Sequence, residues 1–361
     1  MRKNLQHVKE LDGLRGCAAA SVLVLHLFIT GRANHHAVTQ PIAWRIAVRI
    51  ADLGAFGVDV FFVLSGFLIT SLLFTSREKK SFFHNFYWKR VLRIQPVYLV
   101  HLLVTWLLIP GSRGYVFLAL LFIVNFDDKF HVQDNGPAWT LSIEEQFYLI
   151  WPQIIRRFSI PNIYRICIAV IAFSAGLRTF MLAVTGHAML RSTWYRFDGL
   201  AMGALLACEW MLEGEGATPM VRRFLKIFNS RPCFVVALIY EVGILAGSIH
   251  NRASALILLT TNYLVYCTIR YILYHPGSRS FRWLRSSSLL FLGAISYSMY
   301  MYHVFFIYLF DKYLASPIFS WPQFFWRAAF TIAGTFLLCI ASLHLMERPV
   351  QGLRRYVVHP D

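Results

Sequence analysis

Charged side chains are scarce in this sequence: Asp, Glu, Lys and Arg make up 15% of its 361 residues, against roughly 25% in soluble globular domains. Hydrophobic residues make up 57%, and the mean hydropathy is +0.52. A soluble fold alternates apolar positions with polar ones, so this composition excludes an ordinary soluble domain, a disordered chain and a fibre. The sequence is that of a membrane protein.

Acidic residues are scarcer still, because 18 Asp and Glu stand against 35 Lys and Arg, which gives a net charge of +17. A chain this apolar has to keep its charges outside the hydrocarbon of the bilayer, so the basic excess is first a signal of membrane topology. The apolar runs between the basic clusters have no counterpart in a nucleic-acid-binding fold. We expect no nucleic acid among the partners of this protein.

The sequence also lacks a cysteine framework. Its six cysteines lie in or beside apolar runs, and none stands in a CxxC or Cys/His spacing, so no disulfide set is readable and we expect no metal site. It has no internal repeat, no low-complexity tract and no polar interval long enough to fold alone. We therefore expect one membrane domain over residues 1–361, without an additional soluble domain.

What the sequence does contain is a series of apolar runs that could cross a bilayer. With both termini in the cytoplasm, the inner segments hold 22 Lys and Arg and the outer segments hold 8, which is the bias that cytoplasmic loops carry. We predict an all-α, polytopic transmembrane helical bundle of about ten spans. The expected spans are residues 13–31, 54–75, 94–110, 115–126, 162–184, 197–212, 233–249, 253–274, 289–311 and 325–346.

The stretch from Leu141 to Ile155 is apolar enough to form a further span. One more crossing at this point would put the basic residues that follow it on the wrong side of the membrane. We therefore predict a helix that lies at the cytoplasmic face or dips into it.

Arg15 and His26 are ionisable residues of the first predicted span, where a charge costs at least ~2.5 to 3.5 kcal/mol and is a functional hypothesis by default. They stand eleven residues apart, which is roughly 16 Å of helix, so both project from nearly the same face and His26 lies deeper. Burial disfavours the charged imidazolium, and a neutral imidazole can accept a proton from a hydroxyl. The alternative is a packing histidine whose hydrogen bonds are satisfied.

Asp59 lies in the second predicted span, and His26 lies in the first. Each is at about the same depth below the outer end of its span. Consecutive antiparallel helices are usually neighbours, so the two side chains could share a depth and a hydrogen bond. A carboxylate that orients the imidazole would fix its tautomer and stabilise its protonated form. The alternative is that Asp59 ties the entrance of its own helix beside Gly57.

Six basic residues interleaved with aromatics stand between Arg77 and Arg93, a composition typical of a cytoplasmic segment with an aromatic belt. Arg90 and Arg93 differ from the others because they stand three apart on one helical face, just before Pro96 and near the water boundary. Two guanidinium forks at that place could hold the phosphates of an anionic nucleotide.

Ser142 and Glu145 stand three apart, which is the spacing of a capping box that opens a helix. Capping occupies at most one of the adjacent acids Glu144 and Glu145. The other acid is then available to pair with an arginine or to bind a substrate hydroxyl.

His303 is a second mid-span imidazole, with Tyr297 and Tyr300 on nearby faces of the same predicted helix. It either belongs to the site, where His303 and Tyr300 could bind substrate, or makes a structural hydrogen bond. Weaker candidates of the same kind are Arg178, Arg196, Asp198 and Arg327. Arg196 and Asp198 could simply form an ion pair at the membrane boundary.

Seven short motifs follow one another along the chain. They are LDGLRG (11–16) with Arg15 and the later His26, FGVDVFFVLSGFLIT (56–70), KRVLRIQPVY (89–98), PAWTLSIEEQFYLIWP (137–152), YRFDGLAMG (195–203), ISYSMYMYHV (295–304) and ERP (347–349). Together and in this order they resemble the acyltransferase-3 family of integral-membrane acyltransferases. The resemblance implies about ten transmembrane helices, an acyl-CoA donor, and transfer of the acyl group to a hydroxyl of a glycan, a lipid-linked saccharide or a related metabolite.

The resemblance also assigns residues by position. The family's Arg and His fall on Arg15 and His26, its two arginines three apart on Arg90 and Arg93, and its Ser and Glu on Ser142 and Glu145. Acyl-CoA, with acetyl the expected group, would bind from the cytoplasm on Arg15, Arg90 and Arg93. His26, with Asp59 and Glu145 as catalytic partners, would accept the proton of the acceptor hydroxyl as that oxygen attacks the thioester. A covalent acyl-histidine is an open variant.

The same reading leads us to expect a multi-pass protein of a bacterial inner membrane, with no permanently bound cofactor. A different class of function could use the same groups: a secondary transporter that moves protons or polyols, with His26, Asp59 and His303 as its relay. Transporters usually show two halves related by a repeat, and none is visible in this sequence. Cleavage of a thioester would separate the two functions.

Overall fold

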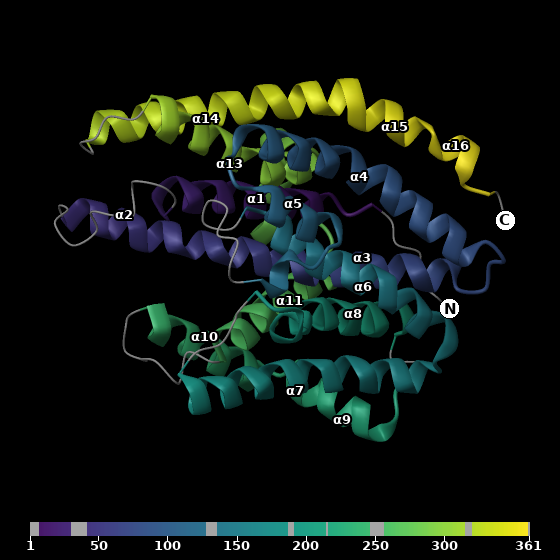
Figure 1. Cartoon of the computed structure of the whole chain (residues 1–361). Helices are drawn as coiled ribbons and strands as arrows, with labels where there is room; N and C mark the ends of the chain where they lie inside the picture. The colour runs from purple at the N-terminus through teal and green to yellow at the C-terminus, as the bar shows by residue number, and fades with distance from the viewer. Residues whose placement is uncertain are drawn as a thin grey trace. The chain divides into compact units, whose positions relative to one another are not determined.

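The computed structural model describes residues 7–29, 42–127, 136–186, 191–213, 216–245, 256–314 and 320–359. Every regular element in these ranges is a helix and none is a strand, so the predicted all-α fold is confirmed for them (Figure 1). The α-helices are α1 (Lys9–Ile29), α2 (Ile42–Asp52), α3 (Phe56–Ser76), α4 (Phe82–Leu108), α5 (Arg113–Leu120), α6 (Ala138–Arg157), α7 (Ile160–Thr185), α8 (Phe197–Leu212), α9 (Pro219–Phe228), α10 (Arg231–Leu245), α11 (Ile257–Tyr274), α12 (Ser287–Ala294), α13 (Ser296–Tyr313), α14 (Trp321–Ser342), α15 (Arg348–Gly352) and α16 (Arg354–Val357).

Several of these helices can cross a membrane. Within the described residues, 5 helical stretches are long and apolar enough to do so, and the number rises to 7 if each of 2 bent helix pairs forms one span. The single stretches begin with α1, α2, α4, α7 and α14, and the bent pairs are α9 with α10 and α12 with α13. The count of about ten spans and the cytoplasmic position of both termini stay predictions.

The fourth predicted span, residues 115–126, is wrong. The chain there forms the 8-residue helix α5, which is only about 12 Å long against a hydrocarbon core of roughly 30 Å. The hydroxyl of Tyr98 in α4 donates a hydrogen bond of 2.7 Å to the carbonyl of Ala119, so α5 lies against α4. A run of a dozen apolar residues is too short to cross and suits a segment that enters the membrane and turns back.

The stretch from Leu141 to Ile155 lies within α6, so the predicted helix is confirmed, and its position at the cytoplasmic face stays a prediction. The helix α6 runs lengthwise along α3. The hydroxyls of Tyr148 and Ser65 are 2.7 Å apart, and the indole nitrogen of Trp151 donates to the hydroxyl of Thr70 at 2.8 Å. These contacts advance in the same direction on both helices, so α6 is parallel to α3.

Contacts divide the chain into two compact units. The first consists of Met1–Leu11, Asp59–Phe82 and Ile143–Arg285, and the second of Asp12–Val58, Phe83–Ser142 and Ser286–Asp361. The single domain expected over residues 1–361 stays a prediction.

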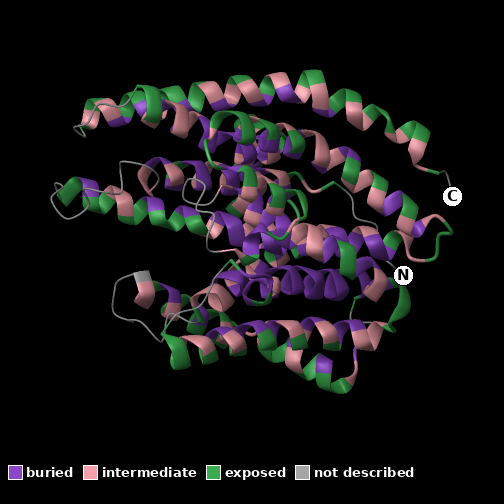
Figure 2. Cartoon of the chain, viewed as in Figure 1, coloured by how far each residue is buried: buried purple, intermediate pink, exposed green. Residues whose placement is uncertain are grey.

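The first unit is built around α8, in which every residue after the first is buried (purple in Figure 2). A helix that is apolar on all sides belongs in a core, and α7 and α11 contact it. Glu209, in the last turn of α8, accepts hydrogen bonds from Tyr266 at 2.5 Å and Asn229 at 3.1 Å, and pairs with Arg270 at 3.1 Å. Buried charge is therefore paired and hydrogen-bonded, as the low dielectric requires.

The second unit contains α1, α4, α13 and α14, and α13 lies beside α14 (Figure 1). The start of α1 contacts α12 so closely that a Cβ at Gly16 would lie 2.4 Å from the carbonyl oxygen of Leu289. A Cβ at Gly293 would lie 2.2 Å from the carbonyl oxygen of Asp12. Only glycine allows backbones to approach so closely, and this contact brings the first turns of α1 to the beginning of α13.

Candidate active site

Two of the predicted side chains meet inside the second unit. The imidazole of His26 in α1 lies edge to face with that of His303 in α13, with 4.9 Å between the ring centroids and 63° between the ring planes. His303 is buried, with 1% of its surface exposed, whereas His26 is half-buried. The two residues are far apart in the sequence, so only the packing of α1 against α13 brings them together.

Hydrogen bonds to the backbone define the tautomers of both rings. Nδ1 of His26 lies 2.8 Å from the carbonyl oxygen of Val22, and Nδ1 of His303 lies 3.1 Å from that of Met299. A carbonyl can only accept, so each Nδ1 carries the hydrogen and each neutral ring keeps its lone pair on Nε2. Nε2 of His303 is buried and has no hydrogen-bond partner among the described residues.

A third buried histidine, His101 in α4, lies near this pair and was missed by the sequence analysis. Its ring stacks on Phe305 with 4.8 Å between centroids, and it lies within electrostatic range of His303. The signal was present, since His101 is an ionisable residue inside the predicted span 94–110. The rule that selected the other two histidines selects this one as well.

The helices that carry these histidines run in the same direction. Arg15 of α1 donates to the hydroxyl of Ser296 at 3.1 Å, at the start of α13, and the imidazoles of the same two helices meet further along. Tyr297 donates to the carbonyl of Ile94 in α4 at 3.0 Å, and the stacking of His101 on Phe305 lies further along both of those helices. α1, α4 and α13 are therefore parallel.

This arrangement separates arginines from histidines by depth. Arg15 precedes His26 by eleven residues, and Arg90 precedes His101 by the same number. Each interval is about 16 Å of α-helix. The arginines therefore form one level of the second unit, and the three imidazoles form another level roughly three helical turns away.

Arg90 and Arg93 are both half-buried on α4. The guanidinium carbon of Arg90 lies 5.9 Å from the ring centroid of Phe86. Arg93 lies within electrostatic range of Glu347, which attracts it, and of Arg354, which repels it. The end of α14 and the helices that follow thus add charged groups of both signs to the arginine level.

Ser142 does not open a helix, so the predicted capping box is wrong. The helix α6 begins earlier, at Ala138, and the hydroxyl of the buried Ser142 donates to the carbonyl of that residue at 2.9 Å. The residue of α6 that makes a polar contact near the histidines is Thr140. Its hydroxyl lies 2.9 Å from the hydroxyl of Tyr300. The ring of Tyr300 is 6.1 Å from that of His303.

Arg327 of α14 holds the turn of α1 that carries His26. Its guanidinium donates two hydrogen bonds of 2.8 Å to the carboxylate of Asp311 and one of 2.5 Å to the carbonyl of Leu27. This weaker candidate therefore has a positioning contact next to His26, and its charge is neutralised by Asp311.

Two further ion pairs lie among the described residues of the first unit. Arg196 lies 3.1 Å from Asp59, and Arg178 lies 2.6 Å from Asp198, with all four side chains almost fully buried. The ion pair that we considered between Arg196 and Asp198 is therefore wrong. Residues two apart in sequence do not face each other on a helix, so each finds its partner on another segment.

Glu144 and Glu145 are half-buried on the part of α6 that belongs to the first unit. Glu144 accepts a hydrogen bond of 3.1 Å from Tyr148, whose hydroxyl also contacts Ser65. This contact joins Glu144 to the interface between α6 and α3.

A comparison with protein families identifies the type of protein. The family model described as an acyltransferase domain, the acyltransferase-3 model, matches residues 8–344, which is most of the chain. The chain belongs to this family. The resemblance carried by the seven motifs is thus confirmed, and the family is one of acyltransferases.

Two curated relatives of this acyltransferase are the O-acetyltransferase OatA of Staphylococcus aureus strain NCTC 8325 and that of strain MRSA252. Each is 27% identical to it over 327 residues, which cover 82% of this chain and 50% of the relative. The chain thus spans about half the length of the curated relatives it matches. No solved structure matches it.

The residues predicted for the site of this acyltransferase divide between the two units. The second unit contains Arg15, His26, Arg90, Arg93, Ser142, Tyr300 and His303. The first unit contains Asp59, Glu144 and Glu145. The hydrogen bond expected between Asp59 and His26, and the roles assigned to all ten residues, stay predictions.

Proposed function

We propose that this acyltransferase transfers an acyl group, in the first place acetyl, from acyl-CoA to a hydroxyl of a glycan, a lipid-linked saccharide or a related metabolite, in a bacterial inner membrane. The observation that carries the proposal is the meeting of His26 and His303, about 16 Å of helix away from a level of arginines on the parallel helices α1 and α4. The names of the relatives, O-acetyltransferases of Staphylococcus aureus, support the reaction type and a bacterial membrane.

Arg15, Arg90 and Arg93 bind the phosphates of the donor in this proposal. Guanidinium forks bind phosphate oxygens through charge-assisted, paired hydrogen bonds. The three side chains belong to α1 and α4, which run parallel from the arginine level to the histidine level. The slender pantetheine arm of acyl-CoA can follow the same direction and bring its thioester to His26.

His26 acts as the general base. Its Nε2 accepts the proton of the acceptor hydroxyl as that oxygen forms a bond to the thioester carbon. The carbon–sulfur bond then breaks, and the imidazolium returns the proton to the sulfur of the leaving CoA. General-base help of this kind contributes typically about 10² to 10⁴ in rate.

Other predicted residues of the second unit assist this step. His303 faces His26 and can stabilise the transient imidazolium through its own Nε2, while Tyr300 and Ser142 bind substrate. Asp59, Glu144 and Glu145 belong to the first unit, and the catalytic and acceptor-binding roles that the sequence suggests for them stay predictions. In a variant of the mechanism His26 itself carries the acyl group as a covalent intermediate before the hydroxyl attacks.

Purified protein in lipid nanodiscs, supplied with acetyl-CoA labelled in the acetyl group, tests the proposal. We expect the label to leave CoA in the wild type and in His275→Ala, and release to fall about 10² to 10⁴-fold in His26→Ala. His275 is an exposed histidine at the end of α11 and serves as the matched control. Unchanged release in His26→Ala removes His26 as the base.

Proteoliposomes separate the enzyme from the transporter. Uptake of protons or polyols without any cleavage of acetyl-CoA would contradict the proposed function and favour transport through the same His and Asp groups.

A further inference from the structure

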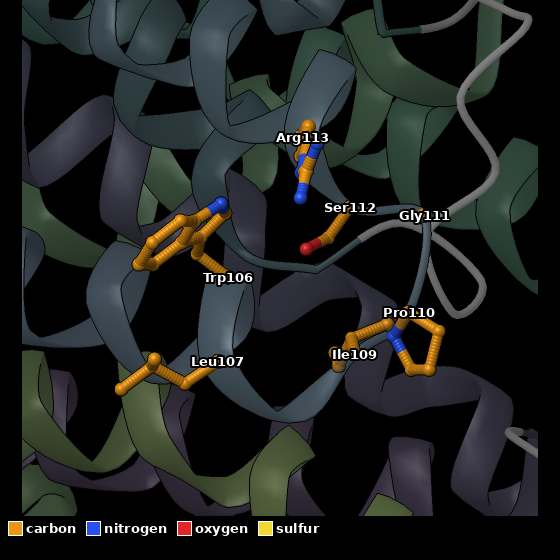
Figure 3. Close-up of a pocket in the computed structure, with 7 residues that line it drawn as sticks. All are labelled: Trp106, Leu107, Ile109, Pro110, Gly111, Ser112 and Arg113. Atoms are coloured by element: carbon orange, nitrogen blue, oxygen red, sulfur yellow. The ribbon is translucent and has the colours of Figure 1, made fainter.

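A pocket lies where α4 turns into α5, at the end of α4 that is remote from Arg90 and Arg93 (Figure 3). Its volume is about 260 Å³, somewhat below the roughly 300 to 1,000 Å³ of sites for drug-sized ligands. A single sugar ring fits this volume better than a whole nucleotide does. The lining residues are Trp106, Leu107, Ile109, Pro110, Gly111, Ser112 and Arg113.

Polar and aromatic groups converge on one side of this pocket. Figure 3 shows the guanidinium of Arg113 and the hydroxyl of Ser112 turned toward the side on which Trp106 lies. Trp106 is 49% exposed, so its indole offers an accessible flat face and an N–H donor. Gly111 has φ 79°, a conformation that other residues rarely adopt, and it forms the turn that places Ser112 and Arg113 here.

Arg113 is exposed and makes neither an ion pair nor a hydrogen bond with any residue that the structure describes. Its guanidinium carries five N–H donors, which suit a ligand that carries oxygen acceptors. Nothing in the fold of the described residues requires an arginine at this position.

The hydroxyl of Ser112 decides between classes of ligand. Ser112 is 1% exposed, and its hydroxyl donates to the carbonyl of Thr105 at 3.1 Å. Its hydrogen is thus engaged, and only lone pairs remain for a ligand. Lone pairs accept from a sugar hydroxyl but repel a phosphate oxygen, so this pocket favours a polyhydroxyl ligand over an anionic headgroup.

The place of the pocket along α4 fits an acceptor site. Trp106 follows Arg93 by 13 residues and His101 by 5, which are about 20 Å and about 8 Å of helix. Arginines, imidazole and pocket therefore succeed one another along one helix of the second unit. The hydroxyl of Tyr308 donates to the carbonyl of Leu108 at 3.2 Å, so α13 accompanies α4 to the pocket.

We infer that this pocket is a binding subsite for one sugar unit of the acyl acceptor. The apolar face of the sugar ring stacks on the indole of Trp106, one hydroxyl donates to Ser112, and ring or hydroxyl oxygens accept from Arg113. The inference rests on the proposed acyltransferase function. It adds that the acceptor is a saccharide. It also adds that the donor phosphates and the acceptor bind on opposite sides of the histidines.

The test compares two activities of the whole protein. The first is the cleavage of acetyl-CoA, with water as the acceptor, by purified protein in nanodiscs. The second is the transfer of acetate to surface glycans, in cells that contain the variant as their only copy of this protein. It is measured as the acetate that base releases from these glycans. Trp106→Ala should lower the second activity about fivefold to tenfold and leave the first unchanged. Trp326→Ala is the control, because Trp326 is 71% exposed on α14 of the same unit and does not line this pocket.

Each outcome decides something different. Wild-type glycan acetate in Trp106→Ala, or an equal loss in Trp326→Ala, overturns the subsite. If Trp106→Ala loses both activities, the variant Arg113→Gln distinguishes a lost subsite from a misfolded protein, because this exposed residue can be replaced without unfolding. If Arg113→Gln loses only the glycan acetate, the result supports the subsite. If it loses neither activity, the result overturns the subsite. A defect of Arg113→Gln seen only in nanodiscs with anionic lipid indicates a headgroup site and overturns it too. Wild-type protein that cleaves no acetyl-CoA contradicts the proposed function itself.

Discussion

The rings of His26 and His303 meet edge to face, with 4.9 Å between their centroids. Both rings donate from Nδ1 to the carbonyl four residues earlier, so both keep the basic nitrogen Nε2. In the proposed mechanism, the second basic ring helps to stabilise the proton that His26 takes from a substrate. The pair is the feature of this fold that is hardest to explain by packing alone.

His303→Phe tests the second ring of the pair. Phenylalanine fills the same space but offers no lone pair, so we expect kcat for acyl transfer to fall about tenfold to a hundredfold at unchanged KM for acetyl-CoA. Steady-state kinetics of purified protein check this, with His275→Phe as the control. A wild-type kcat in His303→Phe would show that His303 is only a packing residue.

Arg90→Gln and Arg93→Gln test the phosphate site. Each substitution removes a charge-assisted fork, so we expect KM for acetyl-CoA to rise about tenfold with little change in kcat. The increase should shrink when the donor is acetyl-dephospho-CoA, which lacks one phosphate, and at high salt. Arg157→Gln, at the exposed end of α6, is the control. Equal effects on both donors would place the two arginines away from the 3′-phosphate.

Asp59→Asn should destabilise the first unit, because it leaves the buried Arg196 without its counter-charge. Breaking a buried pair by removing one partner costs about 3 to 5 kcal/mol, whereas replacing both partners is often nearly neutral. We expect thermal unfolding in nanodiscs to show a large loss for Asp59→Asn and recovery in Asp59→Asn with Arg196→Met.

The same double variant separates the structural role of Asp59 from the catalytic one. If it is stable but transfers acyl groups much more slowly than the wild type, Asp59 also assists His26, as the sequence suggested. Wild-type activity in the stable double variant would assign Asp59 to the ion pair with Arg196 alone.

Hydropathy and charge predicted most of the helices because long apolar runs have few alternatives in a bilayer. The first run, residues 13–31, largely coincides with α1 (Lys9–Ile29). The error came from a segment of intermediate length. The apolar run at 115–126 is too short to cross, because the helix that it forms, α5, has only 8 residues.

Individual site residues were predictable wherever the bilayer makes a polar group costly. His26 and His303 were found in this way, and His101 could have been. Their contact could not be predicted, since it depends on the packing of α1 against α13. The partners of Asp59 and Asp198 were equally hidden, because spacing along one helix does not show which other segment supplies the arginine.

Chemical rescue of His26→Gly is the most direct test of the account. This variant leaves a space in which free imidazole can lie, so single-turnover transfer from acetyl-CoA should be slowed about 10² to 10⁴-fold and partly restored by added imidazole in proportion to the concentration of its neutral form. Transfer by His26→Gly at the wild-type rate, with or without imidazole, would contradict the claim that the imidazole of His26 accepts the proton.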